Sequence, residues 1–234
     1  MAKVRVADLF ARTLVEHGIT DVFMLTGGGA MHLNDGFGRE PGLRKIFNHH
    51  EQAASIAAES YARLCGRPAV LNVTTGPGGV NSLNGVYGAY VDSIGMIVIS
   101  GQVKRETFAP NFPIPLRQLG DQEVDIVAMV RPITKYAVIL NDPADARKVI
   151  EKAIWLSQRG RPGPVWIDVP SDIQGALVDP DELAPYDPAS DDHAGESANT
   201  RAEEGALTGA ALVSTTASTP YERFRIRAAP SRSP

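Results

Sequence analysis

The sequence predicts an α/β fold in which an open, mainly parallel sheet carries helices on both faces. Two observations support this prediction. Short apolar runs alternate with helix-like segments as far as residue 169, as expected for a parallel sheet that is buried on both sides. Polar or glycine-rich residues follow several of these runs, and the carboxyl ends of strands are where such sheets bind ligands.

The first elements are marked by hydrophobic spacing and by glycine. Apolar residues recur at helical spacing over 6–14, and Gly18 is suited to the end of that helix. A short apolar strand is expected over 21–25 and runs into a glycine triplet. A helix over 30–37 and a strand over 43–48 come next.

The most strongly predicted helix spans 51–64. Its stripe of small side chains permits close packing against a neighbour, and Gly66 is suited to end it. We expect a strand over 69–73, a helix over 80–91 and a strand over 95–100 to follow.

A loop over 102–122 holds several prolines and shows no periodicity. Loops of this length in compact domains are usually functional or mobile. Asp142 is expected to cap a later helix, whose first turn accommodates Pro143. The remaining elements, in chain order, are a helix over 124–129, a strand over 133–138, a helix over 143–157 and a strand over 164–169.

The composition changes after residue 174, so we assign 1–174 to the folded domain. Residues 175–188 include an acidic, proline-rich stretch and predict a linker. Residues 189–234 are rich in Ser, Thr, Ala, Gly and Arg. They hold too few large apolar residues to offset the entropy of ordering, so they predict a disordered tail. A shifted reading frame would produce the same abrupt change, which makes an aberrant tail one hypothesis.

Composition bounds the class of protein. A hydrophobic content of 43% and a charged content of 21% are typical of a soluble globular protein, and a net charge of −4 gives no basis for a nucleic-acid or membrane-surface partner. Cys65 is the only cysteine, which excludes an internal disulfide, and we expect it to be buried. Since there is no apolar run that spans a bilayer and no secretory signal, we expect a cytoplasmic protein.

Glu51 stands in the first turn of the helix predicted over 51–64. An acid there is stabilised by the helix dipole and usually has a structural role. Two features favour a functional one: polar residues 48–50 place it at a strand-to-helix corner, and the alanine-rich helix lets another chain pack beside it. The glycine-rich turn 76–79 ends the next strand, and by itself it fits a plain tight turn as well as a ligand loop.

A series of short motifs occurs along the chain: His50-Glu51-Gln52-Ala53-Ala54, Ala58-Glu59-Ser60-Tyr61-Ala62-Arg63, Thr75-Gly76-Pro77-Gly78, Asn81, Ala89-Tyr90-Val91-Asp92-Ser93, Ser100-Gly101-Gln102-Val103, Arg131-Pro132-Ile133-Thr134-Lys135 and Gly163-Pro164-Val165-Trp166-Ile167-Asp168-Val169-Pro170. Together they resemble the N-terminal pyrimidine-binding domain of thiamin-diphosphate-dependent enzymes, in its acetolactate synthase-like branch. The resemblance covers about residues 4–175 and implies the thiamin-diphosphate-binding fold.

The resemblance implies a catalytic role for Glu51. A glutamate at this position hydrogen-bonds a ring nitrogen of the cofactor's aminopyrimidine and so promotes loss of the thiazolium C2 proton, while the cofactor supplies the carbanion chemistry. Thr26 stands where this branch usually has proline. The cofactor-binding residues that the resemblance implies are Thr26, Gly27, Gly28, Glu51, Thr75, Gly76, Pro77, Gly78 and Asn81.

Gln122 is the second catalytic residue that the resemblance implies. With Glu123 and Asp125 it matches a Gln-Glu-x-Asp segment of this branch, whose glutamine faces the substrate. Asp121 replaces the phenylalanine that precedes this glutamine in the synthases, which favours a 2-oxo acid substrate other than a pair of pyruvates. We expect structural or merely polar roles for three histidines near these segments: His32, His49 and His50.

The resemblance also implies parts that this sequence does not contain. Enzymes of the family carry a central domain and a diphosphate-binding domain, whose Gly-Asp-Gly…Asn-Asn motif holds magnesium. That motif is absent here, so we expect no metal site, and thiamin diphosphate held by its pyrimidine end only. FAD, which sits largely on the central domain, is not expected.

Three interpretations stay open. The first is a truncated pyrimidine domain of an acetolactate synthase-like enzyme that acts on 2-oxo acids as a homo-oligomer. The second is one subunit of a two-chain 2-oxo acid decarboxylase, whose partner brings a separate diphosphate-binding chain. The third is a non-catalytic dimerisation module. Titration of thiamin diphosphate and Mg²⁺, with and without a partner chain, would separate them.

Overall fold

The computed structural model describes residues 2–191, which form a six-stranded sheet and a small two-stranded one. All neighbouring strands of the large sheet are parallel, which confirms the predicted fold class. Their carboxyl ends therefore share one edge. Across the sheet the strands are β3 (Arg44–Phe47), β2 (Asp21–Met24), β4 (Ala69–Val73), β5 (Met96–Gln102), β7 (Pro164–Pro170) and β6 (Tyr136–Ile139).

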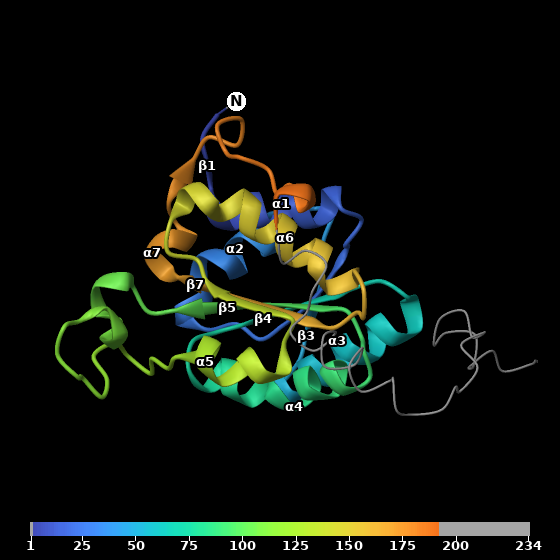
Figure 1. Cartoon of the computed structure of the whole chain (residues 1–234), viewed down its shortest axis with the longest axis horizontal. Helices are drawn as coiled ribbons and strands as arrows, with labels where there is room; N and C mark the ends of the chain where they lie inside the picture. The colour runs from blue at the N-terminus through green and yellow to red at the C-terminus, as the bar shows by residue number, and fades with distance from the viewer. Residues whose placement is uncertain (1, 192–234) are drawn as a thin grey trace, which may run out of the picture. The chain divides into compact units, whose positions relative to one another are not determined.

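Helices cover both faces of this sheet (Figure 1). The helices on one face are α1 (Val6–Glu16), α2 (Met31–Arg39), α6 (Ala146–Gln158) and the short α7 (Ser171–Gln174). The helices on the other face are α3 (Glu51–Cys65), α4 (Pro77–Val91) and α5 (Ile126–Val130). The sheet is thus the middle layer of three, as continuous apolar strands require.

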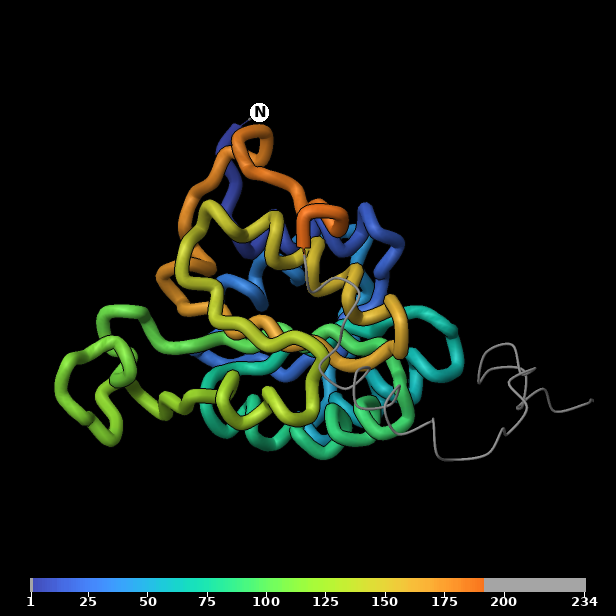
Figure 2. The backbone as a smooth tube through the Cα atoms, in the orientation of Figure 1, coloured from blue at the N-terminus to red at the C-terminus, as the bar shows by residue number. Residues whose placement is uncertain are grey.

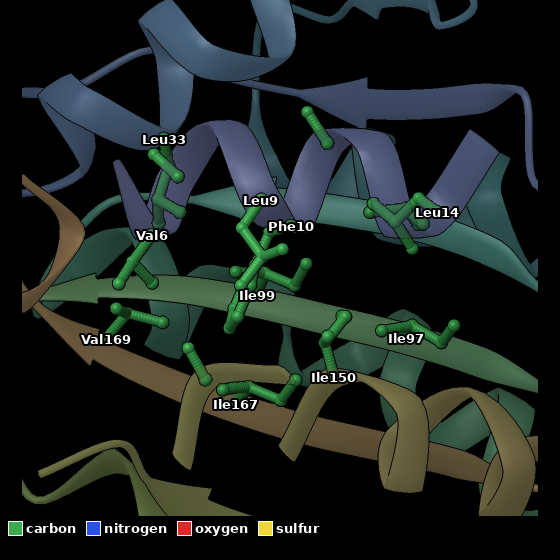
Figure 3. Packing of buried hydrophobic residues seen from close by; sticks show 14 of the residues in the cluster. Val6, Leu9, Phe10, Leu14, Leu33, Ile97, Ile99, Ile150, Ile167 and Val169 are labelled. Atoms are coloured by element: carbon green, nitrogen blue, oxygen red, sulfur yellow. The ribbon is translucent and has the colours of Figure 1, made fainter. Parts of the chain in front are cut away.

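The larger core lies between the sheet and the α1 side (Figure 3). Helix α1 contributes Val6, Phe10 and Leu14, which are fully buried against Ile97 and Ile99 of β5. On the opposite face, alternate strand residues pack against the alanines of α3 and the apolar side of α5. Because both faces of β4, β5 and β7 are covered, the centre of the sheet is rigid and can hold the loops at its edge.

Several boundaries differ from the sequence-based expectations for local reasons. Helix α4 begins at Pro77 rather than at residue 80, since proline is accommodated in the first turn of a helix. Strand β6 begins at Tyr136, because the 3₁₀ turn η4 (Arg131–Ile133) occupies the preceding residues. The Asp142 side chain caps the 3₁₀ turn η5 (Pro143–Asp145), which precedes α6, by accepting a hydrogen bond of 2.9 Å from the Ala144 amide.

Cys65 is exposed, so the expectation that it would be buried is wrong. The buried face of α3 ends at Ala62, and Cys65 is exposed although it points the same way, because it is the last residue of the helix.

The long loop leaves the sheet after β5 and reaches away from the three layers (Figure 2). It contains two 3₁₀ turns, η2 (Arg105–Thr107) and η3 (Ala109–Asn111), and returns to the domain at α5. Three of its large apolar side chains are exposed to solvent: Phe112, Ile114 and Leu119.

The segment that composition suggested as a linker, 175–188, packs on the domain. Strand β8 (Leu177–Val178) pairs antiparallel with β1 (Val4–Arg5), and Leu183 is buried in the larger core. The Tyr186 amide donates a hydrogen bond of 2.7 Å to the Glu151 carboxylate, just before the 3₁₀ turn η6 (Pro188–Ser190). From residue 192 onward the predicted tail lies outside the described residues. Within 2–191, no helix combines the length and apolar character needed to cross a bilayer.

Candidate active site

Two loops and the starts of two helices meet at the carboxyl edge of the central strands. The loop after β2 holds the glycine triplet, and the loop after β4 holds Thr75 and Gly76 and leads into α4. Helix α3 follows the edge strand β3 and begins with Glu51. These segments are distant in sequence, and the parallel sheet brings them together.

Glu51 is buried at this edge, with 8% of its surface exposed. Its Oε2 atom accepts a hydrogen bond of 3.0 Å from Nδ2 of Asn81, which stands in the first turns of α4. Its Oε1 atom has no hydrogen-bond partner among the described residues, and a Cβ atom built on Gly78 would lie 3.6 Å from it. The carboxylate therefore has one oxygen fixed by Asn81 and one oxygen available to a ligand.

The turn before α4 has a backbone that only glycine adopts readily. Gly76 has a φ of +60° and a ψ of −113°. A Cβ atom there would overlap the carbonyl oxygen of Gln122, so the absent side chain also lets the long loop approach the turn. Pro77 then starts α4, and Gly78 leaves room for the side chain of Thr74.

Gln122 reaches the site through its backbone. Its φ of 54° is left-handed, which is uncommon for a residue other than glycine. Its carbonyl oxygen lies against Gly76, and Gln122 as a whole is exposed to solvent. The structure therefore brings the backbone of Gln122 to the edge where Glu51 lies, and the catalytic role of its side chain stays a prediction.

The glycine triplet after β2 is held by hydrogen bonds from three directions. The Gly29 amide donates to Oγ1 of Thr74 at 3.1 Å, and Gln174 of α7 donates to the Gly29 carbonyl oxygen at 2.8 Å. Asn34 of α2 donates to the Gly27 carbonyl oxygen at 3.2 Å. A Cβ atom on Gly27 would overlap the side chain of Thr74, so the backbone of this loop packs directly against that side chain in the loop after β4.

Comparison with known proteins identifies the family at this point. Residues 4–129 match the family model described as "Thiamine pyrophosphate enzyme, N-terminal TPP binding domain". The chain belongs to this family.

The curated relatives that it matches include acetolactate synthases. The chain is 39% identical over 178 residues to acetolactate synthase 2, chloroplastic, of Nicotiana tabacum, covering 75% of this chain and 25% of that protein. It is 38% identical over 167 residues to the acetolactate synthase large subunit of Buchnera aphidicola subsp. Acyrthosiphon pisum, covering 71% and 28%. It is 35% identical over 180 residues to acetolactate synthase isozyme 3 large subunit of Escherichia coli, covering 77% and 29%. The chain thus spans about a quarter of the length of these relatives.

The residues at this edge fit the aminopyrimidine of the family's cofactor, thiamin diphosphate, by their chemistry. An aminopyrimidine offers ring nitrogens and an amino group, and the available oxygen of Glu51 can accept a hydrogen bond from it. Two further buried side-chain oxygens here have no hydrogen-bond partner within residues 2–191, namely Oγ1 of Thr75 and Oδ1 of Asn48. Buried polar atoms without partners are costly, so a ligand that pairs with them is favoured. A Cβ atom on Gly28 would meet nothing within 4 Å, so this glycine borders open space.

The other residues named from the sequence are exposed or contact other parts of the domain. Thr26 is exposed in the loop between β2 and the 3₁₀ turn η1 (Gly28–Ala30). Nδ1 of His50 accepts a hydrogen bond of 3.1 Å from the Gln52 amide and so caps α3, which is a structural role. His32 lies against Gly175, and His49 is exposed. Within residues 2–191, no group of three or more His, Cys, Asp or Glu side chains is arranged to hold a metal ion.

The sequence analysis missed a buried polar cluster below this edge. Asp168 of β7 is completely buried, and burial raises the pKa of its carboxyl to about 7. Its Oδ1 atom accepts a hydrogen bond of 2.5 Å from Oγ of Ser100, and its Oδ2 atom accepts one of 2.8 Å from Nε2 of Gln102. Ser100 and Gln102 lie in one of the family motifs and Asp168 lies in another, but no pattern in the sequence predicts that β5 and β7 are neighbours.

Proposed function

We propose that this chain supplies the pyrimidine-recognition half of a thiamin-diphosphate site, with Glu51 as the group that binds a ring nitrogen of the pyrimidine. One observation carries the proposal: a buried carboxylate with one oxygen fixed by Asn81 and the other available, beside a turn that only glycine can form. A structural first-turn acid would instead be expected to face solvent at the helix end.

Each residue at this edge has a distinct part in the proposal. Glu51 accepts the ring N–H or holds the shared proton at Oε1, and Asn81 keeps the carboxylate oriented. Gly28 leaves space for a flat ring, since it carries no side chain and borders open space, while Gly78 lets the Thr74 side chain pack close to Glu51. Thiamin diphosphate, when bound, supplies carbanion stabilisation for chemistry on 2-oxo acids. Gln122 faces the substrate side of the site in this proposal.

The diphosphate and its Mg²⁺ would be held outside this chain. The relatives are about four times as long as the matched segment, and the sequence holds no Gly-Asp-Gly…Asn-Asn motif. A second polypeptide, or a part of the protein beyond this sequence, would complete the site. Decarboxylation and carboligation of 2-oxo acids are both compatible with the residues present.

The exposed face of α3 and α4 is the surface we propose for a partner chain. Leu64 of α3 and Tyr87 of α4 are 78% and 57% exposed. Val80, Tyr87 and Val91 recur along α4 at spacings that share one helix face, and all are exposed. Exposed apolar side chains on the two helices that carry Glu51 and Asn81 favour an interface along these helices, in a homo-oligomer or with a separate diphosphate-binding chain.

The proposal is tested by calorimetric titration of thiamin and of thiamin diphosphate into the purified chain, with and without Mg²⁺. If this chain binds only the pyrimidine end, both compounds bind with the same dissociation constant, on the order of 1 mM, and Mg²⁺ has no effect. Glu51→Gln is expected to weaken both about tenfold or more. Equal binding by wild-type and Glu51→Gln would contradict the assignment of Glu51 to the pyrimidine. Tighter binding of thiamin diphosphate in the presence of Mg²⁺ would contradict the proposal that the diphosphate site lies outside this chain.

A further inference from the structure

The end of the long loop is fixed to the domain at successive residues. Gln122 lies with its carbonyl oxygen against Gly76. The next residue, Glu123, accepts hydrogen bonds from two amides of the same loop, Gly120 at 2.8 Å and Ala109 at 3.2 Å. Glu123 thereby ties the start of the loop to its end. The backbone at Gln122 is left-handed, so it needs such support to persist.

The following residue, Val124, is held from inside the sheet. Its carbonyl oxygen accepts a hydrogen bond of 2.9 Å from Nε2 of Gln102, the last residue of β5. Gln102 is 1% exposed, and all its polar atoms are used: Nε2 also donates to Asp168, and Oε1 accepts a hydrogen bond of 3.0 Å from the Val103 amide. A side-chain amide with every partner satisfied is locked in one orientation.

Asp168 determines which end of the Gln102 amide faces Val124. An ionised Asp168 only accepts hydrogen bonds, and the Val124 carbonyl oxygen accepts whether or not Asp168 is ionised, so the NH₂ group of Gln102 points inward. If the amide were reversed, its oxygen would face two acceptors, Asp168 and the Val124 carbonyl, and the Val103 amide would lose its partner. Ser100 donates to the other oxygen of Asp168 and accepts a hydrogen bond of 2.7 Å from Nε1 of Trp166, so the carboxylate is itself held in place.

Burying this acid is costly. The carboxyl is completely buried with no cation among its hydrogen-bond partners, and burial raises its pKa. Apolar packing at such a place is often more stable than a buried ionisable group. Burial of Asp168 therefore lowers stability, and its structural effect is to fix the orientation of the Gln102 side-chain amide.

We propose that Gln102 and Asp168 are positioning residues, which hold Val124 from within the sheet and so fix Gln122 beside Gly76 at the edge of the cofactor site. The functional importance of this inference rests on the proposed function, since the position of Gln122 affects activity only if the edge binds cofactor and substrate. The geometric part stands by itself: without the Gln102 bond, segment 120–126 separates from the domain more often.

Hydrogen exchange of the ligand-free chain tests the geometric part. The amides to follow are those of Gly120, Ile126 and Ala128, which are hydrogen-bonded within or beside the segment. Gln102→Glu keeps the shape of residue 102 and removes its N–H donors. We expect these amides to exchange about tenfold faster in Gln102→Glu, after correction for global stability measured by urea unfolding.

Variants at Asp168 and Ser100 provide matched comparisons. Asp168→Asn can still accept from Gln102 through its amide oxygen and donate to Ser100, so exchange in segment 120–126 stays as in the wild type. Asp168→Val offers Gln102 no acceptor and is expected to reproduce the effect of Gln102→Glu, which keeps the test valid if Gln102→Glu does not fold. Ser100→Ala disturbs the same cluster but leaves the Gln102 to Val124 bond in place, so it lowers global stability without a local effect.

The two hypotheses fail separately. If Gln102→Glu and Asp168→Val accelerate exchange in segment 120–126 no more than Ser100→Ala does, the positioning role is overturned, whether or not thiamin binds. If the local effect is present but the wild type binds no thiamin, the positioning role stands and the proposed function fails. If thiamin binds, Gln102→Glu and Asp168→Val are expected to weaken it much less than Glu51→Gln does, because they act through Gln122 on the substrate side.

Discussion

The Glu51 carboxylate and the Asn81 amide meet at 3.0 Å across the first turns of α3 and α4. This bond orients a buried acid at the carboxyl edge that has an available oxygen, and its donor comes from the helix that follows the Gly76 turn. The orientation of Glu51 therefore depends on how closely the two helices approach each other.

Asn81→Ala is expected to weaken thiamin binding about tenfold, because Glu51 loses the donor that orients it. The matched control is Asn84→Ala, one turn along α4 at another exposed position, which should leave binding unchanged. Calorimetric titration of thiamin measures both. Equal affinities for the two variants would show that Asn81 does not orient the acid.

Gly76→Ala is expected to destabilise the chain by about 2 kcal/mol or more, since it combines a left-handed φ with overlap of the Gln122 carbonyl oxygen. Gly28→Ala is the comparison in the opposite loop, where a Cβ atom meets nothing. Its stability should stay within about 0.5 kcal/mol of the wild type, while its affinity for thiamin falls. Urea unfolding of both variants measures the difference, and a stable Gly76→Ala would mean that the turn can relax.

Two glycines of α4 should respond in opposite directions. A Cβ atom at Gly85 would overlap the backbone of Ser55 in α3, so Gly85→Ala is expected to cost about 2–3 kcal/mol. A Cβ atom at Gly88 would meet nothing, so Gly88→Ala should stabilise the helix by about 0.5–1 kcal/mol. Thermal unfolding followed by circular dichroism gives both signs. A neutral Gly85→Ala would show that α3 and α4 can separate.

Asp168 is expected to make stability fall as pH rises. The buried carboxyl keeps its proton up to a pKa of about 7, whereas the unfolded chain releases it near pH 4. Between these values the unfolded state binds fewer protons, so the free energy of unfolding decreases with pH, and above pH 7 this contribution is constant. From pH 5 to pH 8 the loss is on the order of 3 kcal/mol.

Asp168→Asn provides the comparison for this pH dependence, since it has no proton to lose. The measurement is urea unfolding of both proteins at pH 5 and pH 8, and the expected outcome is a pH-dependent difference between them. A difference that is the same at both pH values would mean that Asp168 titrates normally.

The apolar face of α3 and α4 is expected to drive self-association. Leu64→Glu together with Tyr87→Glu should shift the chain to monomers in sedimentation experiments, because two exposed apolar side chains are replaced by charges. Leu177→Glu replaces another highly exposed leucine, on β8, and is the control. If the wild type is monomeric at high concentration, self-association through this surface is contradicted, and the surface would instead bind a different partner chain.

The sequence predicted the order and type of the main helices and strands, because each has its own period, cap or glycine stop. Glu51 and the turn 76–79 could be singled out as candidate site residues for the same reason, because both follow strands that the sequence predicts. The family resemblance then gave these residues a chemical meaning, and the family is confirmed.

Features that depend on long-range contact could not be predicted. The pairing of β1 with β8 involves strands of two residues each, too short for any periodicity. The packing of 175–188 rests on Val178 and Leu183, two buried apolar side chains in a stretch whose composition is that of a linker. The bond from Gln102 to Asp168 joins β5 to β7, and only the strand order of the folded sheet makes them neighbours.

The pairing of β1 with β8 places the first and last strands of the described chain side by side. Domains with adjacent ends usually tolerate circular permutation when the new ends fall in an exposed loop. Here the chain can be opened between residues 112 and 119, where the long loop is exposed, and its ends joined by a flexible peptide from residue 191 to residue 4, which keeps Leu183 in the core. Such a permutant would release the loop from its covalent tether while leaving the sheet intact, so it would show how far Glu123 and Gln102 alone hold Gln122 in place.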